Sequence, residues 1–212
     1  DVDADVTLTG TLPTIANTSP GVSLLVVGNG FSVDGNNAVR VFDVAGATVE
    51  FEAITITGGN TDYGGGIHND AGTVTVTGST VTSNTSTIRG GGIYNFNGGS
   101  LTVTDSSVTG NSSVRGGGIS NVDAASTLTV SRSTISANTA TERGGGLYHA
   151  TNATPTVSNS TISGNTGTDL GGGIYNEDNT VNVIYSTIPD NTSAAGAGIR
   201  SFGDAETFTN VS

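Results

Sequence analysis

The 212-residue sequence contains no cysteine, no methionine, no tryptophan and no lysine, because all six of its basic residues are arginines. Without cysteine there can be neither a disulfide framework nor a thiolate metal site. Six arginines against 18 acidic residues give a net charge of −12, so the chain lacks the basic surface that nucleic acids and anionic membranes require. No apolar run approaches the length of a membrane-spanning helix. We therefore expect no nucleic-acid partner and no membrane insertion.

Hydrophobic residues are also scarce, at 33% of the chain, and aromatic residues make up 5%. Such a composition is poor for a compact globule and by itself suggests disorder. A regular repeat overrides that interpretation, because a narrow repetitive core needs only a few aliphatic side chains per turn. Ser, Thr, Asn and Gly are then expected to fill the turns and the outer faces.

A repeat runs through most of the chain, and its clearest copy is residues 101–121, LTVTDSSVTGNSSVRGGGISN. Each copy contains two short apolar runs, an Asn, and a glycine triplet followed by an aliphatic residue. The triplets, the last of which has decayed to GAG, begin at Gly64, Gly90, Gly116, Gly144, Gly171 and Gly196. Their spacing of 25–28 residues indicates a solenoid, in which each unit buries its apolar face against its neighbours.

Three runs per repeat are rich in Val, Ile and Thr and are bounded by Gly, Asn or Ser. Runs this short and this β-branched predict strands rather than helices. The sequence therefore predicts an all-β fold, a parallel β-solenoid of about eight coils with three strands per coil, in which neighbouring coils are about 4.8 Å apart. We expect a single domain over residues 1–212, with irregular N-terminal coils at 1–48, regular repeats at 49–201, and the start of a further coil or an assembly contact at 202–212.

The register of the repeats predicts three interior columns of aliphatic side chains. The first, the core stripe, consists of Val81, Val108, Ile135, Ile162 and Ile188. The second consists of Val76, Val103, Val130, Val157 and Val183, and the third of Ile67, Ile93, Ile119, Leu147, Ile174 and Ile199. Because side chains alternate along a strand, their neighbours should point outward, which accounts for the many threonines and for Tyr94, Tyr148 and Tyr175.

Asparagines recur with the same period. The predicted structural ladder consists of Asn60, Asn84, Asn111, Asn138, Asn165 and Asn191. Asn tolerates the left-handed backbone of a tight turn, and its amide can hydrogen-bond the amide in the next coil. A second series consists of Asn69, Asn95, Asn121 and Asn176, with His149 and Ser201 as substitutes. The glycine triplets are predicted to form a sharp bend where side chains do not fit.

The motifs GGGIYN, LTVTDSSVTGN and SNSTISGN resemble the right-handed parallel β-helix repeat of large bacterial extracellular proteins. They are similar to the polymorphic outer-membrane protein repeat, which combines GGxI with Phe-x-x-Asn. Here GGxI is matched, whereas Val or Ile occupies the Phe position, as in Val108-x-x-Asn111 and Ile162-x-x-Asn165. Over residues 20–201 this resemblance implies a right-handed β-helix in a secreted or surface-displayed rod, and no particular ligand.

Arg89, Arg115 and Arg143 each precede a glycine triplet, so they are expected to stack along one edge. Such a strip could grip an anionic glycan or a neighbouring acidic rod, or it could pair with local acids such as Glu142 and Asp169. The three tyrosines would flank this edge, where they could stack on sugar rings or pack across strands.

Acidic residues at the N-terminus are a candidate for calcium. Asp1, Asp3 and Asp5 alternate along the chain and could contribute ligands, although we favour a frayed and solvated terminus as their explanation.

Parallel β-helices also host enzymes that cleave acidic polysaccharides, which resemble one another in aspartates clustered on one outer face. Here the acids are scattered over Asp62, Asp70, Asp105, Asp123, Glu142, Asp169, Glu177, Asp178 and Asp190. Glu50 and Glu52 share a face but have no partner carboxylate in the next coil's strand at residues 74–77, and His68 and His149 belong to different columns. A glycosidase needs two carboxylates across a cleft. We therefore predict no catalytic, cofactor-binding or metal-binding residue.

The sequence favours a non-enzymatic extracellular or cell-surface solenoid, a rod-like component of a fibre, layer or stalk. The alternatives are an adhesin module that binds surface glycans or proteins, and a polysaccharide lyase or hydrolase. Neither end shows the helix or charged cap that would cover an exposed coil, so we expect end-to-end self-association or continuation into a longer chain. The absence of Met at position 1 indicates a processed or excised segment from which any signal peptide has been removed.

Overall fold

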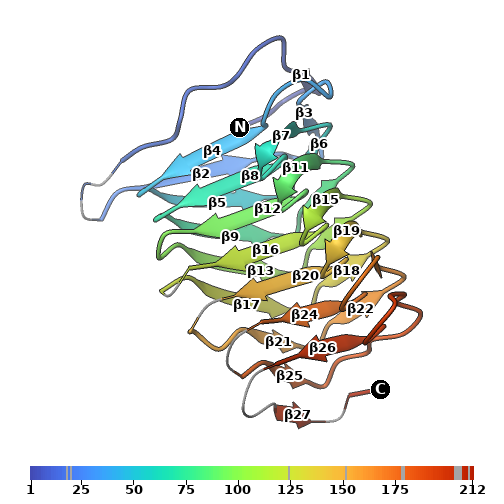
Figure 1. Cartoon of the computed structure of the whole chain (residues 1–212). Coiled ribbons are helices and arrows are strands. Elements are labelled where there is room, and N and C mark those ends of the chain that lie inside the picture. The colour runs from blue at the N-terminus through green and yellow to red at the C-terminus, as the bar shows by residue number, and fades with distance from the viewer. Residues whose placement is uncertain are drawn as a thin grey trace.

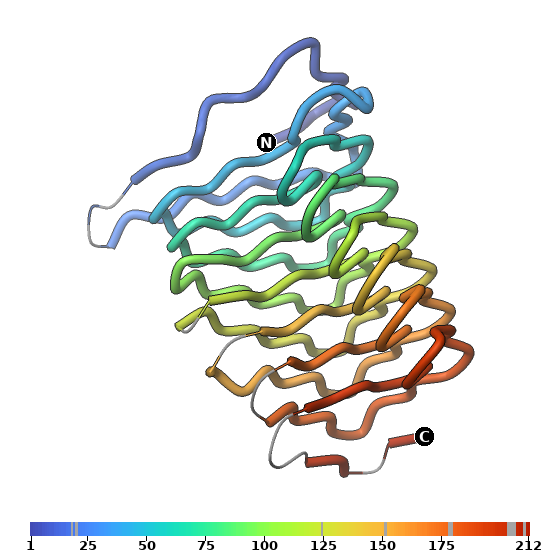
Figure 2. The backbone as a smooth tube through the Cα atoms, viewed as in Figure 1, coloured from blue at the N-terminus to red at the C-terminus, as the bar shows by residue number. Residues whose placement is uncertain are grey.

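The computed structural model is a stack of short parallel strands wound coil upon coil (Figure 1). The structure describes residues 1–17, 19, 21–123, 125–150, 152–177, 180–202, 207–209 and 211–212, and every regular element in these ranges is a strand. Figure 2 shows the chain advancing in one direction, from the blue N-terminal coils to the red C-terminal coils.

The strands form four sheets, which we label A to D. Sheet A contains β1 (Val6–Thr7), β3 (Ser32–Asp34), β6 (Thr55–Thr57), β10 (Thr80–Thr82), β14 (Ser107–Thr109), β18 (Thr134–Ser136) and β22 (Thr161–Ser163). Sheet B contains β4 (Phe42–Ala45), β8 (Ile67–Asp70), β12 (Ile93–Phe96), β16 (Ile119–Val122), β20 (Leu147–Ala150), β24 (Ile174–Asn176) and β26 (Ile199–Ser201).

Sheet C is the longest and in Figure 1 lies behind sheet B. It contains β2 (Ser23–Val27), β5 (Thr48–Glu52), β9 (Thr73–Thr77), β13 (Ser100–Thr104), β17 (Thr127–Ser131), β21 (Thr156–Ser158), β25 (Asn182–Ile184) and β27 (Thr207–Thr209). Sheet D contains β7 (Asn60–Tyr63), β11 (Thr85–Arg89), β15 (Ser112–Arg115), β19 (Thr139–Arg143) and β23 (Thr166–Gly167).

The all-β parallel solenoid is confirmed, and the eight strands of sheet C agree with the predicted number of coils. The prediction of three strands per coil is wrong, because sheet D adds a fourth strand to the central coils. Its inward-facing residues have small side chains or none, namely Ser86, Ser113, Ala140 and Gly167. Without a column of large aliphatic residues, this sheet gave no hydrophobic signal in the sequence.

The three predicted aliphatic columns form one continuous core. Val81, Val108, Ile135 and Ile162 are aligned by the strand register of sheet A and have no exposed surface. Ile188, in the last coil, is half-buried and packs against the same cluster. The second column is fully buried, and the third is fully buried except for the half-buried Ile199 at its end. Burial of these apolar side chains between neighbouring coils is the main favourable contribution to folding.

The asparagine ladder is confirmed for five of its six predicted members, Asn84, Asn111, Asn138, Asn165 and Asn191. Each of the first four donates its Nδ2 to Oδ1 of the next at 2.9–3.0 Å. The same Nδ2 also reaches a backbone carbonyl of the preceding coil, for example Asn111 to Val81. Each of these four amides therefore ties three successive coils together.

Two details of the ladder differ from the prediction. Asn60 is exposed in β7, and Gly59 occupies the ladder position, from which its N–H donates to Asn84 Oδ1 at 2.8 Å. The left-handed backbone belongs to the residue before each ladder asparagine, such as Ser83 with φ of 55° and Ala137 with φ of 53°. Hydrogen bonding between amides, rather than tolerance of positive φ, explains why Asn occupies these positions.

The second asparagine series is also a ladder. Asn69 donates to Asn95 and Asn95 to Asn121, both at 2.6 Å, and Asn121 Nδ2 lies 3.1 Å from Nδ1 of His149. His149 has no exposed surface, so it serves as a ladder member, in a different column from His68 as predicted. Asn176 donates to Ser201 at 2.8 Å, which extends the series into the last strand of sheet B.

A third ladder, which we did not predict, lies in the turns between sheets C and A. It consists of Ser79, Ser106, Ser133, Ser160 and Ser186. Each hydroxyl after the first accepts the N–H of the serine in the preceding coil at 3.1–3.2 Å, and that of Ser79 accepts the N–H of Ile54. These serines recur every 26 or 27 residues, but the chain contains so many other Ser and Thr residues that this spacing does not stand out in the sequence.

The glycine triplets form the predicted sharp bend. The first glycine of each triplet has a positive φ, as at Gly90 with 65°. A Cβ on Gly91 would lie 2.4 Å from the carbonyl oxygen of Ser112, and one on Gly92 would lie 2.7 Å from that of Gly118. Neighbouring coils therefore approach too closely here for any side chain.

We predict that Ile135→Ala lowers the free energy of unfolding by about 2–4 kcal/mol, because it opens a cavity in the core stripe. Thr129→Ala is the matched control, since Thr129 is exposed on sheet C in the same coil and should change stability little. Thermal or denaturant unfolding measures both. Equal losses in the two variants would contradict the assignment of inward and outward positions.

Candidate interaction surface

The outer face of sheet B carries one column of polar and aromatic side chains along its whole length. In register it consists of Asp43, His68, Tyr94, Ser120, Tyr148, Tyr175 and Arg200. The three tyrosines point away from the core as predicted, yet they are only 6%, 1% and 2% exposed. They form a second apolar cluster with Val122, and Tyr63, Ala150 and Leu170 pack against it. The rings of Tyr148 and Tyr175 are therefore covered and offer no open platform for a sugar.

The predicted arginine stack lies beside this column. Arg89, Arg115 and Arg143 are paired in register in β11, β15 and β19. Arg115 Nε lies 2.7 Å from Glu142 Oε2, as expected for a local partner. Arg143 pairs with Glu177, its NH1 lying 3.3 Å from Oε1. Asp169, the other local acid that we named, forms no ion pair with an arginine among the described residues. Among the described residues Arg89 has no carboxylate partner.

The arginines also lie against tyrosine rings. The guanidinium carbon of Arg89 is 5.4 Å from the centroid of the Tyr148 ring, and that of Arg143 is 5.2 Å from Tyr175. Ser120 stands between Tyr94 and Tyr148 in the column, so Arg89, on the strand before Tyr94, reaches past Ser120 to the Tyr148 ring. A planar guanidinium on a ring face gains cation–π attraction, which partly offsets the repulsion between stacked positive charges.

Hydrogen bonds complete this part of the surface. Arg143 NH1 donates to the Tyr175 hydroxyl at 3.1 Å, and the Tyr148 hydroxyl donates to Glu177 Oε2. Burial raises the pKa of Tyr94 and of Tyr148 to about 12, and in Tyr148 the bond to Glu177 adds to the rise. Burial also raises the pKa of Tyr175. These phenols therefore remain protonated at neutral pH and present neutral rings, and the Tyr148 hydroxyl acts as a donor.

Asp43 organises the N-terminal end of the column. It accepts hydrogen bonds from Thr14 Oγ1 at 2.6 Å and Arg40 NH1 at 2.9 Å, and it lies 2.7 Å from His68 Nδ1. Burial acts to raise the pKa of Asp43, but the hydrogen bonds from Thr14 and His68 and the charge of Arg40 hold that pKa below its usual value. The ionised carboxylate fixes His68, whose ring stacks on Tyr94 with centroids 5.5 Å apart.

Next to this cluster is a shallow hollow of about 390 Å³, lined by Tyr63, His68, Asp70, Tyr94 and Phe96, which we call the aromatic hollow. Tyr94 lies 5.1 Å from Tyr63 and 5.7 Å from Phe96, measured between ring centroids. Phe96 is 37% exposed. The sequence did not single out this group, because Tyr63 and Phe96 occur in one coil each and leave no periodic signal.

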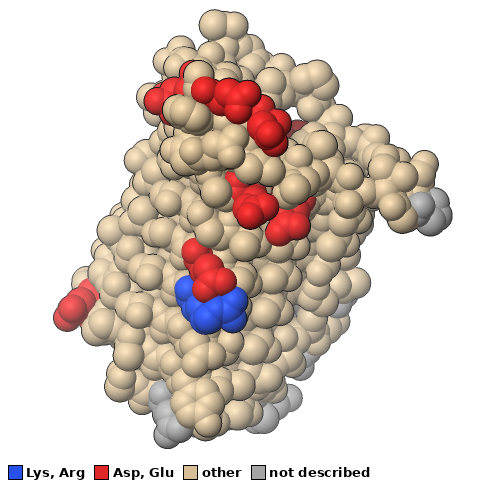
Figure 3. All heavy atoms as spheres, turned by 180° about the vertical axis from the view of Figure 1, so that it is seen from behind, with Lys and Arg blue, Asp and Glu red and all other residues tan. Residues whose placement is uncertain are grey.

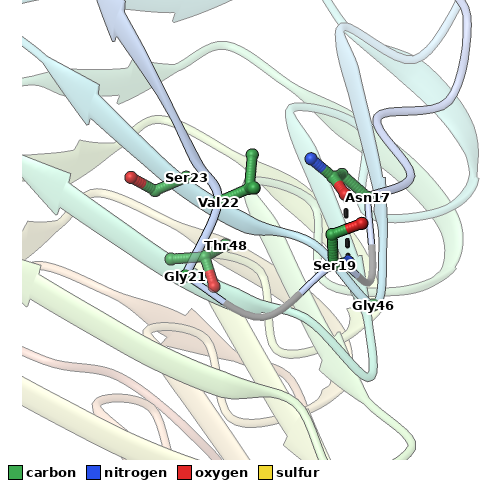
Figure 4. A pocket seen from close by; sticks show the side chains of 7 residues that line it. All are labelled: Asn17, Ser19, Gly21, Val22, Ser23, Gly46 and Thr48. Carbon is green, nitrogen blue, oxygen red and sulfur yellow. Dashed lines mark hydrogen bonds between the residues drawn. The ribbon is translucent and has the colours of Figure 1, made fainter.

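A second hollow, of about 340 Å³, lies between β2, Thr48 of β5 and the loop before β2 (Figure 4). Its lining residues are Asn17, Ser19, Gly21, Val22, Ser23, Gly46 and Thr48. The backbone N–H of Ser19 donates to Asn17 Oδ1 at 3.0 Å. None of these side chains is ionisable, so this hollow offers hydrogen bonds but no acid–base chemistry. A third, of about 250 Å³, is lined in part by Thr14, Arg40 and Asp43 and belongs to the cluster already described.

Most of the remaining acidic residues face solvent. From behind, Figure 3 shows red side chains gathered over the N-terminal coils, with one blue group beside a red one lower on the rod. Glu50 and Glu52 are exposed and lie opposite Thr75 and Thr77 of the next coil, as the register predicted. Arg132 pairs with Asp105 at 2.7 Å. Asp178 lies outside the described residues.

The N-terminal acids form hydrogen bonds with residues of the next coil. Asp5 accepts from the backbone N–H and the hydroxyl of Ser32, both at 2.8 Å, and Asp3 accepts from Asn29 at 3.4 Å. Across the part of the chain that the structure describes, no group of three or more His, Asp or Glu side chains is placed to hold a metal ion. Within the same ranges no helix has the length and hydropathy needed to cross a membrane.

The family model described as a right-handed beta helix region matches residues 15–188, which is most of the chain. No curated protein and no solved structure matches it. The matched range includes both the arginine stack and the aromatic hollow.

We predict that Tyr94 and Tyr148 ionise only near pH 12, well above the usual value for tyrosine of about 10. Because the folded state favours the neutral phenols, their contribution to stability is fully present below pH ~10 and is lost as the pH rises towards 12. Phenolate absorbance and circular dichroism, recorded together, test this, and Tyr148→Phe should remove one late-titrating group. Complete ionisation near pH 10 in folded protein would contradict the burial of these rings.

Proposed function

The chain belongs to the right-handed β-helix family, and from that premise we propose that it is a non-enzymatic structural solenoid. It would serve as a rod-like component of an extracellular or cell-surface fibre, layer or stalk, whose copies stack end to end. The fold alone does not choose between a structural and an enzymatic role. The observation that carries the proposal is the geometry of the two ends of sheet C.

Each of the two edge strands of sheet C leaves an apolar side chain exposed. At the N-terminal end, β2 leaves Leu24 43% exposed, although the next three residues of its column, Val49, Val74 and Leu101, are buried. At the C-terminal end, β27 leaves Phe208 46% exposed below the buried Val183. Both edges belong to the same sheet, so β27 of one copy can pair with residues 23–26 of the next, which places Phe208 on Val26 in the register used inside the rod. The carbonyl of Val27 does not take part, because it already accepts the N–H of Val2 at 2.8 Å. Such a head-to-tail contact does not close and propagates as a filament.

The arginine stack supports a structural role on the side of the rod. The carboxylates nearest to it, Glu142 and Glu177, are engaged by Arg115 and Arg143. Glu177 also accepts the hydrogen bond from Tyr148. Both carboxylates are therefore held by side chains of the rod itself, as expected for a structural network.

We predict that the purified chain forms end-to-end oligomers whose length grows with concentration, and that Leu24→Asp abolishes them by placing a charge in the contact. Sedimentation velocity and negative-stain imaging measure length and mass. Ile88→Asp is the matched control, because Ile88 is 38% exposed on β11 at the side of the rod. A wild-type chain that remains monomeric at all concentrations would refute stacking.

A separate prediction concerns catalysis. Incubation with polygalacturonate and alginate, with and without calcium, should release no new reducing ends and no unsaturated products. Turnover that disappears in Glu177→Gln or Glu142→Gln would assign an enzyme site to the arginine stack and would overturn the non-enzymatic proposal.

A further inference from the structure

The rod repeats one local arrangement on its outer face, an aromatic ring covered by an arginine of the chain itself. Three guanidinium groups lie over rings, namely Arg89 over Tyr148, Arg143 over Tyr175 and Arg200 over Phe202, at 4.6–5.4 Å from the ring centroids. The most complete case is Arg143, which lies on the Tyr175 ring and also pairs with the carboxylate of Glu177. A ring face together with a carboxylate therefore holds a guanidinium in this molecule.

The aromatic hollow contains the same elements without the guanidinium. Phe96 and Asp70 are directly opposite each other in the register of β12 and β8, so the exposed ring stands one coil from the carboxylate. Tyr63 and Tyr94 supply two further rings. Among the described residues, no cation lies over Phe96 and none pairs with Asp70, whose side chain accepts only a neutral bond from Asn97 Nδ2 at 2.8 Å.

The basic side chains near the hollow are engaged by other residues, so the carboxylate of Asp70 can still pair with a cation from outside the chain. The nearby Arg40 is already paired with Asp43, and its NH2 donates to the carbonyl of Tyr63 at 2.9 Å. His68 is likewise held by Asp43. Arg89 acts on Tyr94 at the border of the hollow, but its guanidinium lies over the Tyr148 ring, and it forms no ion pair with Asp70. The chain as a whole carries a net charge of −12, which favours the approach of a cation to this site.

We propose that this hollow binds an arginine side chain of a protein or peptide partner. The guanidinium would lie flat on the exposed face of Phe96 and donate hydrogen bonds to the carboxylate of Asp70. A guanidinium fits this role better than an ammonium, because it is planar, weakly hydrated and able to stack while its edge donates in a fork. The site lies on the side of the rod, so binding requires only a single copy and does not depend on end-to-end stacking.

The test uses the whole 15N-labelled chain and the tripeptide Ac-Gly-Arg-Gly-NH2. We expect saturable chemical-shift changes confined to resonances of β7, β8 and β12. Replacing arginine by citrulline, which keeps the shape and removes the charge, should weaken binding at least about fivefold, and replacing it by lysine should weaken it about threefold.

Two variants test the residues. Asp70→Asn should weaken binding about fivefold, and it keeps an oxygen that can accept from Asn97. Phe96→Leu should weaken it about threefold by removing the ring while leaving an apolar side chain. Asp190→Asn is the charge-matched control, since this exposed residue near the C-terminal end has a positive φ of 58° that asparagine adopts readily. It should bind like the wild type, and thermal melts verify that all variants are folded.

Several results would overturn the proposal. These are the absence of saturable shifts at the hollow, equal binding of the citrulline or lysine peptide, and an effect of Asp190→Asn as large as that of Asp70→Asn. Shifts at the hollow produced by a neutral oligosaccharide but not by the arginine peptide would also overturn it and would assign the site to carbohydrate. None of these outcomes bears on filament formation, which the Leu24→Asp variant tests separately.

Discussion

The parallel stacking of coils in register constrains every other feature of this protein. A side chain meets its counterpart from the coil before and the coil after, so each inward position must suit a residue that packs against copies of itself. Val and Ile meet this requirement by burying apolar surface on both sides. Asn meets it because its amide carries both donors and an acceptor, so one amide bonds the next without a change of orientation. The core stripe and the ladder of Asn84, Asn111 and Asn138 are two solutions to the same constraint.

Charged side chains cannot meet this constraint by repetition, because like charges on neighbouring strands repel one another. The aligned Arg89, Arg115 and Arg143 show how the repulsion is offset. Glu142 and Glu177 contribute negative charge from outside the column, and tyrosine rings accept two of the guanidinium groups on their faces. Of the three stacked arginines, Arg89 and Arg143 therefore lie on tyrosine rings of sheet B, whereas Arg115 pairs with Glu142 on the neighbouring strand of sheet D.

The sequence predicted the parts of the fold that repeat with large or distinctive residues. The solenoid, the aliphatic columns and most of the asparagine ladder followed from spacing alone. Sheet D did not, because Ser86, Ser113 and Ala140 are too small to mark a buried strand. Asn60 was misplaced by one residue because Gly59, which has no side chain, holds the ladder position through its backbone N–H. The pairing of Arg143 with Glu177 could not be predicted, since it depends on how far two long side chains reach across different sheets.

Inward columns tolerate little variation in residue type, whereas outward columns tolerate much. The outer face is therefore where coils can differ from one another. The interior columns hold nearly uniform residues, because an exception there leaves a cavity or an unsatisfied amide. The outward column of sheet B changes from Asp43 and His68 through Tyr94 and Ser120 to Tyr148 within five strands. Such variation leaves the core untouched, so each coil can present a different chemistry at a fixed spacing. In the C-terminal half three rings lie under the chain's own arginines. In the neighbouring outward column, Phe96 is 37% exposed and lies opposite the half-buried Asp70. The uniform interior thus supplies the scaffold, and the outward positions of sheet B supply a different set of side chains at each coil.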